Sequence, residues 1–250
     1  MKPFALMALA ILLALPAAFA QQNDDQIQAE VQKAVSGSEF RGVQATVQNG
    51  VVTLTGTTDL VAHKVKAERK VQHAKGVVGV RDEIQVVGPD IPDEVLQQQL
   101  QKKIEYDMVG YGTTAFDAIT VQVHNGVVIL GGQAYGPVDA SDALAIAENT
   151  KGVKDVIDNI QTDPVSPNDD QIRLAVFRKV YGYPPLNKYA INPVKPIRIQ
   201  VENGHVTLYG VVDSEADKQM AGIQANTVPG VFSVTNDLQV AGEGGEQPGK

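Results

Sequence analysis

The sequence has no cysteine among its 250 residues. A chain without cysteine is not a disulfide scaffold, cannot carry a lipid on an N-terminal cysteine and has no thiol nucleophile. After residue 20 it also lacks any apolar stretch long enough to span a bilayer. Hydrophobic cores alone must therefore stabilise its fold.

The one long apolar run lies at the N-terminus. Lys2 precedes twelve apolar residues from Phe4 to Leu15, Pro16 ends the run, and Ala18-Phe19-Ala20 has the small-x-small form of a cleavage site. Twelve residues are short for a span but fit the central region of a secretory signal peptide. We therefore predict a signal peptide at residues 1–20, cleaved after Ala20, and an exported mature chain without a transmembrane span. A retained N-terminal anchor helix is the alternative.

Basic residues are outnumbered by acidic ones. Without Lys2 the chain has 20 basic and 29 acidic residues, a net charge of −9, and so is a poor candidate for binding nucleic acid. Residues 21–88 hold eight of each sign, residues 89–166 hold four basic and twelve acidic, and residues 167–250 hold eight basic and nine acidic. An anionic membrane would therefore repel the middle segment more than the other two.

One sequence phrase is present three times. It runs Asn49-Gly-Val-Val-Thr-Leu-Thr-Gly56, and its further copies are Asn125–Gly132 and Asn203–Gly210, at steps of 76 and 78 residues. A Gly-Val pair follows 20 residues past the last glycine of each copy, at Gly76, Gly152 and Gly230. The repetition predicts three tandem copies of one small module. Asn-Gly favours a type I′ turn, so each phrase is predicted to form a β-hairpin.

Two helices are predicted in each module. The first, from Asp25, Asp93 and Asp170, has an apolar stripe at i, i+4 and i+8, and aspartate suits a helix start. The stripes are Ile27, Val31, Val35; Leu96, Leu100, Ile104; and Ile172, Val176, Val180. The second helix begins near Asp59, Asp139 and Asp213, presents small residues to the sheet and ends at the Gly-Val pair.

A third strand completes each module, at residues 80–86, 156–162 and 234–240. With the preceding strand and helix it forms a right-handed β-α-β unit. The predicted fold class is α+β: three tandem α-β-β-α-β modules, each a three-stranded mixed sheet with two helices on one face. The modules are placed at residues 24–88, 92–163 and 168–241, with Pro-rich linkers between them and a disordered tail at 242–250. The bare sheet face is expected to pack on a neighbouring module or a partner.

The hairpin phrase, its closing glycine and the Gly-Val-x-x-Val ending resemble the BON domain, a bacterial module named for osmotically induced periplasmic proteins and nodulation proteins. The ending runs from Gly76 to Val80, Gly152 to Val156 and Gly230 to Val234. The resemblance covers nearly all of residues 24–240 and departs from the usual two modules in having three. It implies a non-enzymatic protein of the periplasm, associated with membranes or phospholipids, often in envelope stress.

The modules differ between the first helix and the first strand. The distance from the last stripe residue to the turn asparagine is 14 residues in the first copy, 21 in the second and 23 in the third. The two longer loops are rich in tyrosine, and cations surround the second of them. Such loops suit a lipid headgroup, a glycan or a peptide. Alternatively the loop folds back and its rings cover a small core. The ligand-contact candidates are Tyr181, Tyr183, Tyr189, Arg178, Lys179, Lys188 and Lys195, with Tyr106 and Tyr111 as secondary candidates.

The first module has a basic set on its second helix. Its secondary candidates for an anionic headgroup or polymer are Lys64, Lys66, Arg69 and Lys70. Lys66 and Lys70 share a helix face because they are four residues apart. The alternative is a solvated helix face balanced by Asp59 and Glu68.

Patterns typical of catalysis are missing from the sequence. The histidines, at 63, 73, 124 and 205, lack metal-ligand spacing, and there is no Gly-x-Ser-x-Gly or dinucleotide-binding motif. We therefore predict no enzyme activity, no cofactor and no metal. The leading hypothesis is a periplasmic binding protein that contacts the phospholipid surface of the membrane in envelope or osmotic stress. The alternatives are a chaperone-like or interaction scaffold for exported or envelope proteins, and peptidoglycan binding.

Overall fold

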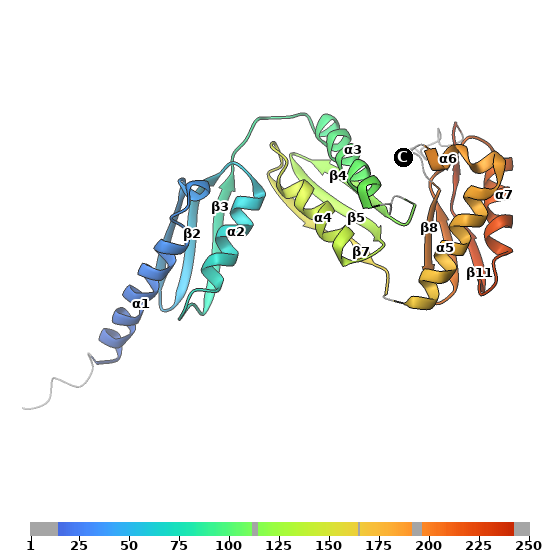
Figure 1. Cartoon of the computed structure of the whole chain (residues 1–250). Helices are drawn as coiled ribbons and strands as arrows, with labels where there is room; N and C mark the ends of the chain where they lie inside the picture. Colours follow the sequence, from blue (N-terminus) through green and yellow to red (C-terminus); the bar gives the residue numbers. More distant parts are fainter. Residues whose placement is uncertain (1–14, 112–114, 165, 192–196, 243–250) are drawn as a thin grey trace, which may run out of the picture. The chain divides into compact units, whose positions relative to one another are not determined.

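The computed structural model describes residues 15–111, 115–164, 166–191 and 197–242. The chain divides into two compact units, one up to Pro89 and the other from Asp90 onward. The first unit contains one α-β-β-α-β module and the second contains two (Figure 1). The predicted α+β fold of three modules is confirmed. The predicted tail, all but residue 242, lies outside the described residues.

Each module repeats the same order of elements. In the first module these are α1 (Leu15–Ala34), η1 (Ser38–Phe40), β1 (Val43–Gln48), β2 (Val51–Thr58), α2 (Val61–Gln72) and β3 (Gly79–Val86). The second has α3 (Asp93–Tyr111), β4 (Ala118–His124), β5 (Val127–Ala134), α4 (Pro137–Glu148), β6 (Asp155–Asp158) and β7 (Gln161–Thr162). The third has α5 (Pro167–Gly182), η2 (Pro184–Leu186), α6 (Lys188–Ile191), β8 (Arg198–Glu202), β9 (His205–Tyr209), β10 (Val211–Val212), α7 (Glu215–Asn226), β11 (Ser233–Asn236) and β12 (Gln239–Val240).

The second hairpin strand is central in every sheet. β2 pairs antiparallel with β1 and parallel with β3, and β5 and β9 have the same two kinds of partner. In the second and third modules the last strand is interrupted, yet β7 and β12 continue its parallel pairing. The parallel pairing across α2, α4 and α7 is that of a β-α-β unit.

The repeated phrase has the backbone of a type I′ turn. Its asparagines have φ of 51–53° and the glycines that follow have φ of 74–79°. The glycine that closes the first phrase, Gly56, has φ 107°, and a Cβ there would lie 2.0 Å from the carbonyl oxygen of Gly42. Only glycine fits this close approach of two strands.

The core of the first module lies between its sheet and its two helices, as the stripes predict. Ile27 and Val31 of α1, Leu54 of β2 and Ala67 and Val71 of α2 are buried together. Figure 1 shows α1 and α2 on the same side of this sheet. The other side exposes polar residues, among them Gln44, Thr46, Arg81 and Glu83.

Two predicted helix starts are wrong. α1 begins at Leu15 and not at Asp25, so it includes residues 15–20 of the predicted signal peptide. α5 begins at Pro167 and not at Asp170, because the Ser166 hydroxyl accepts a hydrogen bond from the Asp169 N–H at 3.2 Å and caps the helix. Cleavage after Ala20 stays a prediction.

Candidate ligand-binding surfaces

In each first helix, the aspartate three residues before the first stripe residue binds the hairpin turn of its module. The Asp24 carboxylate accepts hydrogen bonds from the N–H groups of Asn49 and Gly50 at 2.7 and 2.8 Å. Asp93 makes the same pair of contacts in the second module at 2.7 and 2.9 Å, and Asp169 makes them in the third at 3.0 and 2.8 Å. Backbone hydrogen bonds lower the pKa of Asp93. Burial raises that of Asp169, but its hydrogen bonds outweigh burial and leave its pKa lowered. Each first helix is thereby fixed to one end of its sheet.

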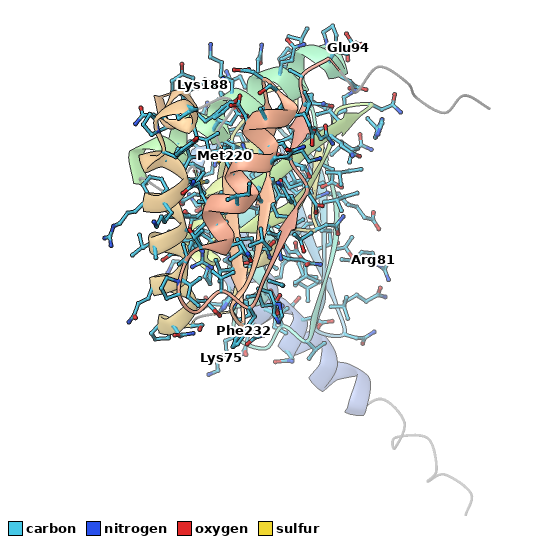
Figure 2. The ribbon with its side chains drawn as sticks, turned by 90° about the vertical axis from the view of Figure 1, so that its right-hand side faces the viewer. Lys75, Arg81, Glu94, Lys188, Met220 and Phe232 are labelled. Carbon is cyan, nitrogen blue, oxygen red and sulfur yellow. The ribbon has the colours of Figure 1, made fainter. Side chains whose placement is uncertain are left out.

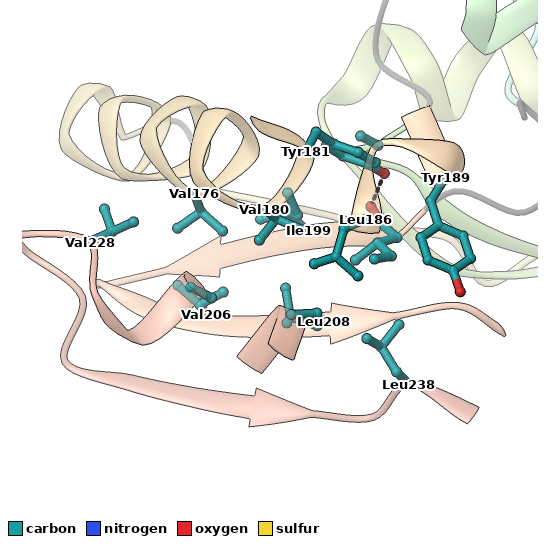
Figure 3. Close-up of a cluster of buried hydrophobic side chains, with 14 of the residues drawn as sticks. Val176, Val180, Tyr181, Leu186, Tyr189, Ile199, Val206, Leu208, Val228 and Leu238 are labelled. Atoms are coloured by element: carbon teal, nitrogen blue, oxygen red, sulfur yellow. Dashed lines mark hydrogen bonds between the residues drawn. The ribbon is translucent and has the colours of Figure 1, made fainter. Parts of the chain in front are cut away.

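The tyrosine-rich loop of the third module covers that module's own core. Tyr181 is 5% exposed and Tyr189 is 4% exposed, and both lie near Leu186 and Ile199 (Figure 3). The Tyr181 hydroxyl donates to the carbonyl oxygen of Ile197 at 2.6 Å, and burial raises the pKa of this tyrosine. Two of the three leading tyrosine candidates therefore occupy the positions that the core-covering alternative predicts.

The Tyr189 hydroxyl belongs to a small polar cluster. It donates to Asp217 and accepts from the Asp213 N–H, both at 2.7 Å. Lys188 forms ion pairs with Asp213 at 2.8 Å and with Asp217 at 2.9 Å. The hydrogen bonds that Lys188 donates to these two carboxylates raise its pKa, and Lys188 in turn lowers the pKa of Asp213. The charge of Lys188 is thus balanced within the module. Lys195 lies outside the described residues.

The remaining candidates lie at the C-terminal half of α5. Arg178 and Lys179 are exposed, Leu174 is 44% exposed one helical turn before Arg178, and Tyr183 is partly buried just after the helix. Among the described acidic side chains, none forms an ion pair with Arg178 or Lys179. We call Leu174, Arg178, Lys179 and Tyr183 the α5 surface.

The other first helices have cations at the same positions. Lys33 of α1 and Lys102 of α3 correspond to Arg178, since each lies six residues after the first stripe residue. The Lys102 Nζ lies 5.8 Å from the ring centre of Tyr106, a secondary candidate that is 56% exposed. Tyr111, another secondary candidate, is the last residue of α3. Sequence reasoning missed Lys33 and Lys102, although their constant spacing could have revealed them.

The basic set of the first module is partly neutralised. Lys66 pairs with Glu39 at 2.9 Å, and Lys64 lies 3.9 Å from Asp82. The Lys70 Nζ lies 5.3 Å from the ring centre of Phe40, and Arg69 is exposed. Glu39 and Asp82 therefore balance this helix face.

A buried arginine joins the second and third modules. Arg173 of α5 is 2% exposed, and its Nη2 donates to Asp163 at 2.7 Å and to the carbonyl oxygen of Val201 at 3.2 Å. Its other terminal nitrogen donates to Asp170, and its guanidinium carbon lies 4.7 Å from the ring centre of Tyr135. Burial raises the pKa of Asp163, and the charge of Arg173 opposes that rise.

The long loop of the second module contacts the edge strand of the third. The Ile199 N–H in β8 donates to the carbonyl oxygen of Ala115 at 2.6 Å. The Phe116 ring lies 5.5 Å from that of Tyr135 and 5.8 Å from that of Phe177 in α5. These contacts explain why the two modules form one unit. This contact lies at a sheet edge, whereas the expectation concerned the bare sheet face, which stays a prediction.

Among the described residues, no group of three or more histidine, aspartate or glutamate side chains is arranged to hold a metal ion. Of the described histidines, His63 contacts Asp59 and His205 contacts Ser233, each at 2.7 Å.

The same described residues contain no helix that is both long enough and apolar enough to cross a membrane.

Comparison with known proteins identifies the module. The BON domain model matches the chain at residues 23–88, 92–164 and 168–242. Osmotically-inducible protein Y of Escherichia coli (strain K12) is 28% identical over 148 residues, which are 55% of this chain and 69% of that protein. An uncharacterized protein in the gshII 5′ region of Anaplasma centrale is 27% identical over 124 residues, 49% of this chain and 82% of that protein.

Solved structures give distant similarities. The C-terminal domain of CdsD, a structural protein of the type III secretion system of Chlamydia trachomatis, aligns at 16% identity and a TM-score of 0.23, over 85% of this chain and 96% of that one. The PrgH periplasmic domain aligns at 8% identity and a TM-score of 0.20, over 80% of this chain and 95% of that one. The three matches to the BON domain model together span most of the sequence. The protein therefore belongs to the BON domain family and contains three copies of this domain.

Proposed function

We propose that the protein is a non-enzymatic binding protein of the periplasm whose third module contacts anionic phospholipid headgroups through the α5 surface. The observation that carries this proposal is that Arg178 and Lys179 are exposed beside Leu174 without an ion pair to any described residue. Unpaired cations attract lipid phosphates, and a neighbouring apolar side chain contacts the acyl boundary. The similarity to an osmotically inducible protein supports a role in envelope or osmotic stress.

The first helices of the other modules could add further weak contacts. Lys33 is exposed at the equivalent position of α1, and the segment 21–88 has no net charge. Lys102 and Lys103 occupy these positions in α3, but the segment 89–166 is strongly acidic. We therefore rank the first module second and the middle module last. Linked weak sites raise the overall affinity without any new contact.

Co-sedimentation of the mature protein with phosphatidylglycerol vesicles at low and high salt tests the proposal. Each cation near an anionic surface contributes about 1 kcal/mol. Removing two by Arg178→Glu and Lys179→Glu should therefore weaken binding at least about 30-fold. The matched control is Lys151→Glu with Lys154→Glu, which changes the net charge equally at exposed positions of the second module. No low-salt binding by the wild type, or equal losses in both variants, would contradict the proposal.

A second candidate function is capture of unfolded exported proteins. Val78 and Phe232 occupy equivalent positions just after the second helix and are 76% and 78% exposed. Phe232 lies at one end of its module (Figure 2), where its N–H donates to the carbonyl oxygen of Gly204 at 2.9 Å. Exposed apolar side chains can contact apolar segments of unfolded chains. Val78→Ser with Phe232→Ser should then abolish suppression of the aggregation of an unfolded outer-membrane protein, while vesicle binding is unchanged.

A further inference from the structure

A polar pocket lies on the third module's sheet face, next to the second module. Its floor is formed by β8 and β9, and β5 of the second module contributes Gln133. The two floor strands contribute Gln200, Glu202, His205, Thr207 and Tyr209. Asn203, in the turn between β8 and β9, lines one end. The pocket requires both modules, because Gln133 comes from the second and the floor from the third.

Side-chain hydrogen bonds fix two residues in the floor of this pocket. The Gln200 Nε2 donates to Asp163 at 3.1 Å, and the Tyr209 hydroxyl donates to the Gln200 Oε1, also at 3.1 Å. Asp163 is fixed in turn by the buried Arg173. The amide of Gln200 and the ring of Tyr209 are therefore held in place before any ligand arrives, which lowers the entropy cost of binding.

One polar atom of a side chain that lines the pocket has no partner among the described residues. The Oε1 of Gln133 is buried, and no described residue donates a hydrogen bond to it. A buried acceptor needs a donor, which water or a ligand hydroxyl can supply. Thr207 and Asn203 add further donors, and Glu202 adds a carboxylate acceptor.

The charge of the lining selects the kind of ligand. His205 is the one basic side chain among the described residues that line the pocket, which include no lysine or arginine. The carboxylate of Glu202 disfavours an anion such as a lipid phosphate. Amides, a hydroxyl, a carboxylate and a tyrosine ring instead match a ligand with many hydroxyls and a partly apolar ring face. We propose that this pocket binds a neutral saccharide chain, at a site separate from the α5 surface.

The first module supplies an internal control. Thr53 of β2 occupies the position of Thr207, four residues after the turn asparagine, but Thr55 stands where the third module has Tyr209. Thr53→Val therefore makes the same chemical change as Thr207→Val on a face without the pocket.

The test is a titration of the ¹⁵N-labelled mature protein with N-acetylglucosamine tetramer and, separately, maltotetraose, followed by amide chemical shifts. We expect a Kd of about 1 mM, with shifts centred on Gln133, Thr207 and Tyr209. Loss of one neutral hydrogen bond in Thr207→Val or Gln133→Leu should weaken binding about fivefold. Thr53→Val should bind like the wild type, and so should the α5 variant Arg178→Glu, Lys179→Glu. Well-dispersed spectra will show that each variant is folded.

The inference is overturned if neither saccharide shifts these amides at about 10 mM, roughly ten times the expected Kd. It is equally overturned if Thr207→Val and Thr53→Val have the same effect. Because the α5 variant keeps the pocket, failure of vesicle binding and failure of saccharide binding are separate results.

Discussion

Replacing Arg173 by methionine is predicted to destabilise the second unit alone. Arg173 is 2% exposed and binds the side chain of Asp163, which is itself 2% exposed. Methionine fills most of the same volume but leaves the Asp163 carboxylate buried without its cation. The mutation therefore removes one partner of a buried ion pair rather than a surface contact.

The size of the stability loss depends on the hydrogen bond that Asp163 retains after the mutation. Removing one partner of a buried ion pair costs about 3–5 kcal/mol. Asp163 retains the hydrogen bond from Gln200, and burial already raises its pKa, so it can take up a proton instead of staying charged. We therefore expect the low end of the range, about 3 kcal/mol. In a unit of this size, that loss lowers Tm by about 6–12 °C.

Calorimetry of the mature protein should resolve the effect, because the two units can unfold in separate transitions. The matched control is Gln28→Met at the equivalent position of α1. Gln28 donates to the carbonyl oxygen of Ala45 at 2.9 Å and accepts from the Val47 N–H at 3.0 Å, so its loss should affect only the first unit. Adding Asp163→Asn to Arg173→Met should recover at least half of the lost stability. An unchanged second-unit transition in Arg173→Met, or no recovery in the double variant, would refute the buried ion pair.

Three further predictions concern single positions. Gly56→Ala should destabilise the first unit by at least about 2 kcal/mol in urea unfolding, because Gly56 has φ 107° and an added Cβ would meet backbone atoms. The control Gly79→Ala should leave the stability unchanged, because an added Cβ there has no atom within 4 Å. Tyr181→Phe should cost the second unit about 1 kcal/mol, because a buried hydroxyl-to-carbonyl hydrogen bond is lost; no change would show that the hydroxyl is dispensable. The pKa of Asp169 is lowered in the folded state, so its stabilisation is present above the unfolded pKa of about 3.9 and is lost as the pH falls through the folded pKa. Asp169→Asn should therefore be less stable than the wild type at pH 7, with the difference shrinking in acid; a constant difference would contradict the shift.

Local chemistry made much of each module predictable. Asn-Gly sets a type I′ turn, and the spacing of Ile27, Val31 and Val35 sets a buried helix stripe, so the hairpins and first helices follow from short stretches of sequence. The contact between Asp24 and the turn was missed because it joins residues 25 apart, and the distance grows to 34 residues at Asp169. The three aspartates nevertheless share one spacing, three residues before the first stripe residue.

The candidate site was less predictable, because a tyrosine beside cations suits a surface and a core equally well. Tyr181 and Tyr189 can be buried because their hydroxyls donate hydrogen bonds to Ile197 and Asp217, which lie 16 and 28 residues further along the chain. Composition contains no information on such distant partners. The buried position of Arg173 could not be predicted for the same reason, because its acceptors belong to the linker and to β8.

The position of Arg173 shows how repeated modules become different from one another. At this position the first two modules have glutamine, and Gln28 and Gln97 accept hydrogen bonds from the backbone N–H groups of Val47 and Val123 in their own sheets. Arginine is longer and charged, so it also reaches the Asp163 carboxylate in the linker and the Tyr135 ring of the preceding module. Together with the long loop that places Ala115 against β8, this one change joins two modules into one unit. The same junction creates the pocket beside Gln133, which a single module of this fold could not form.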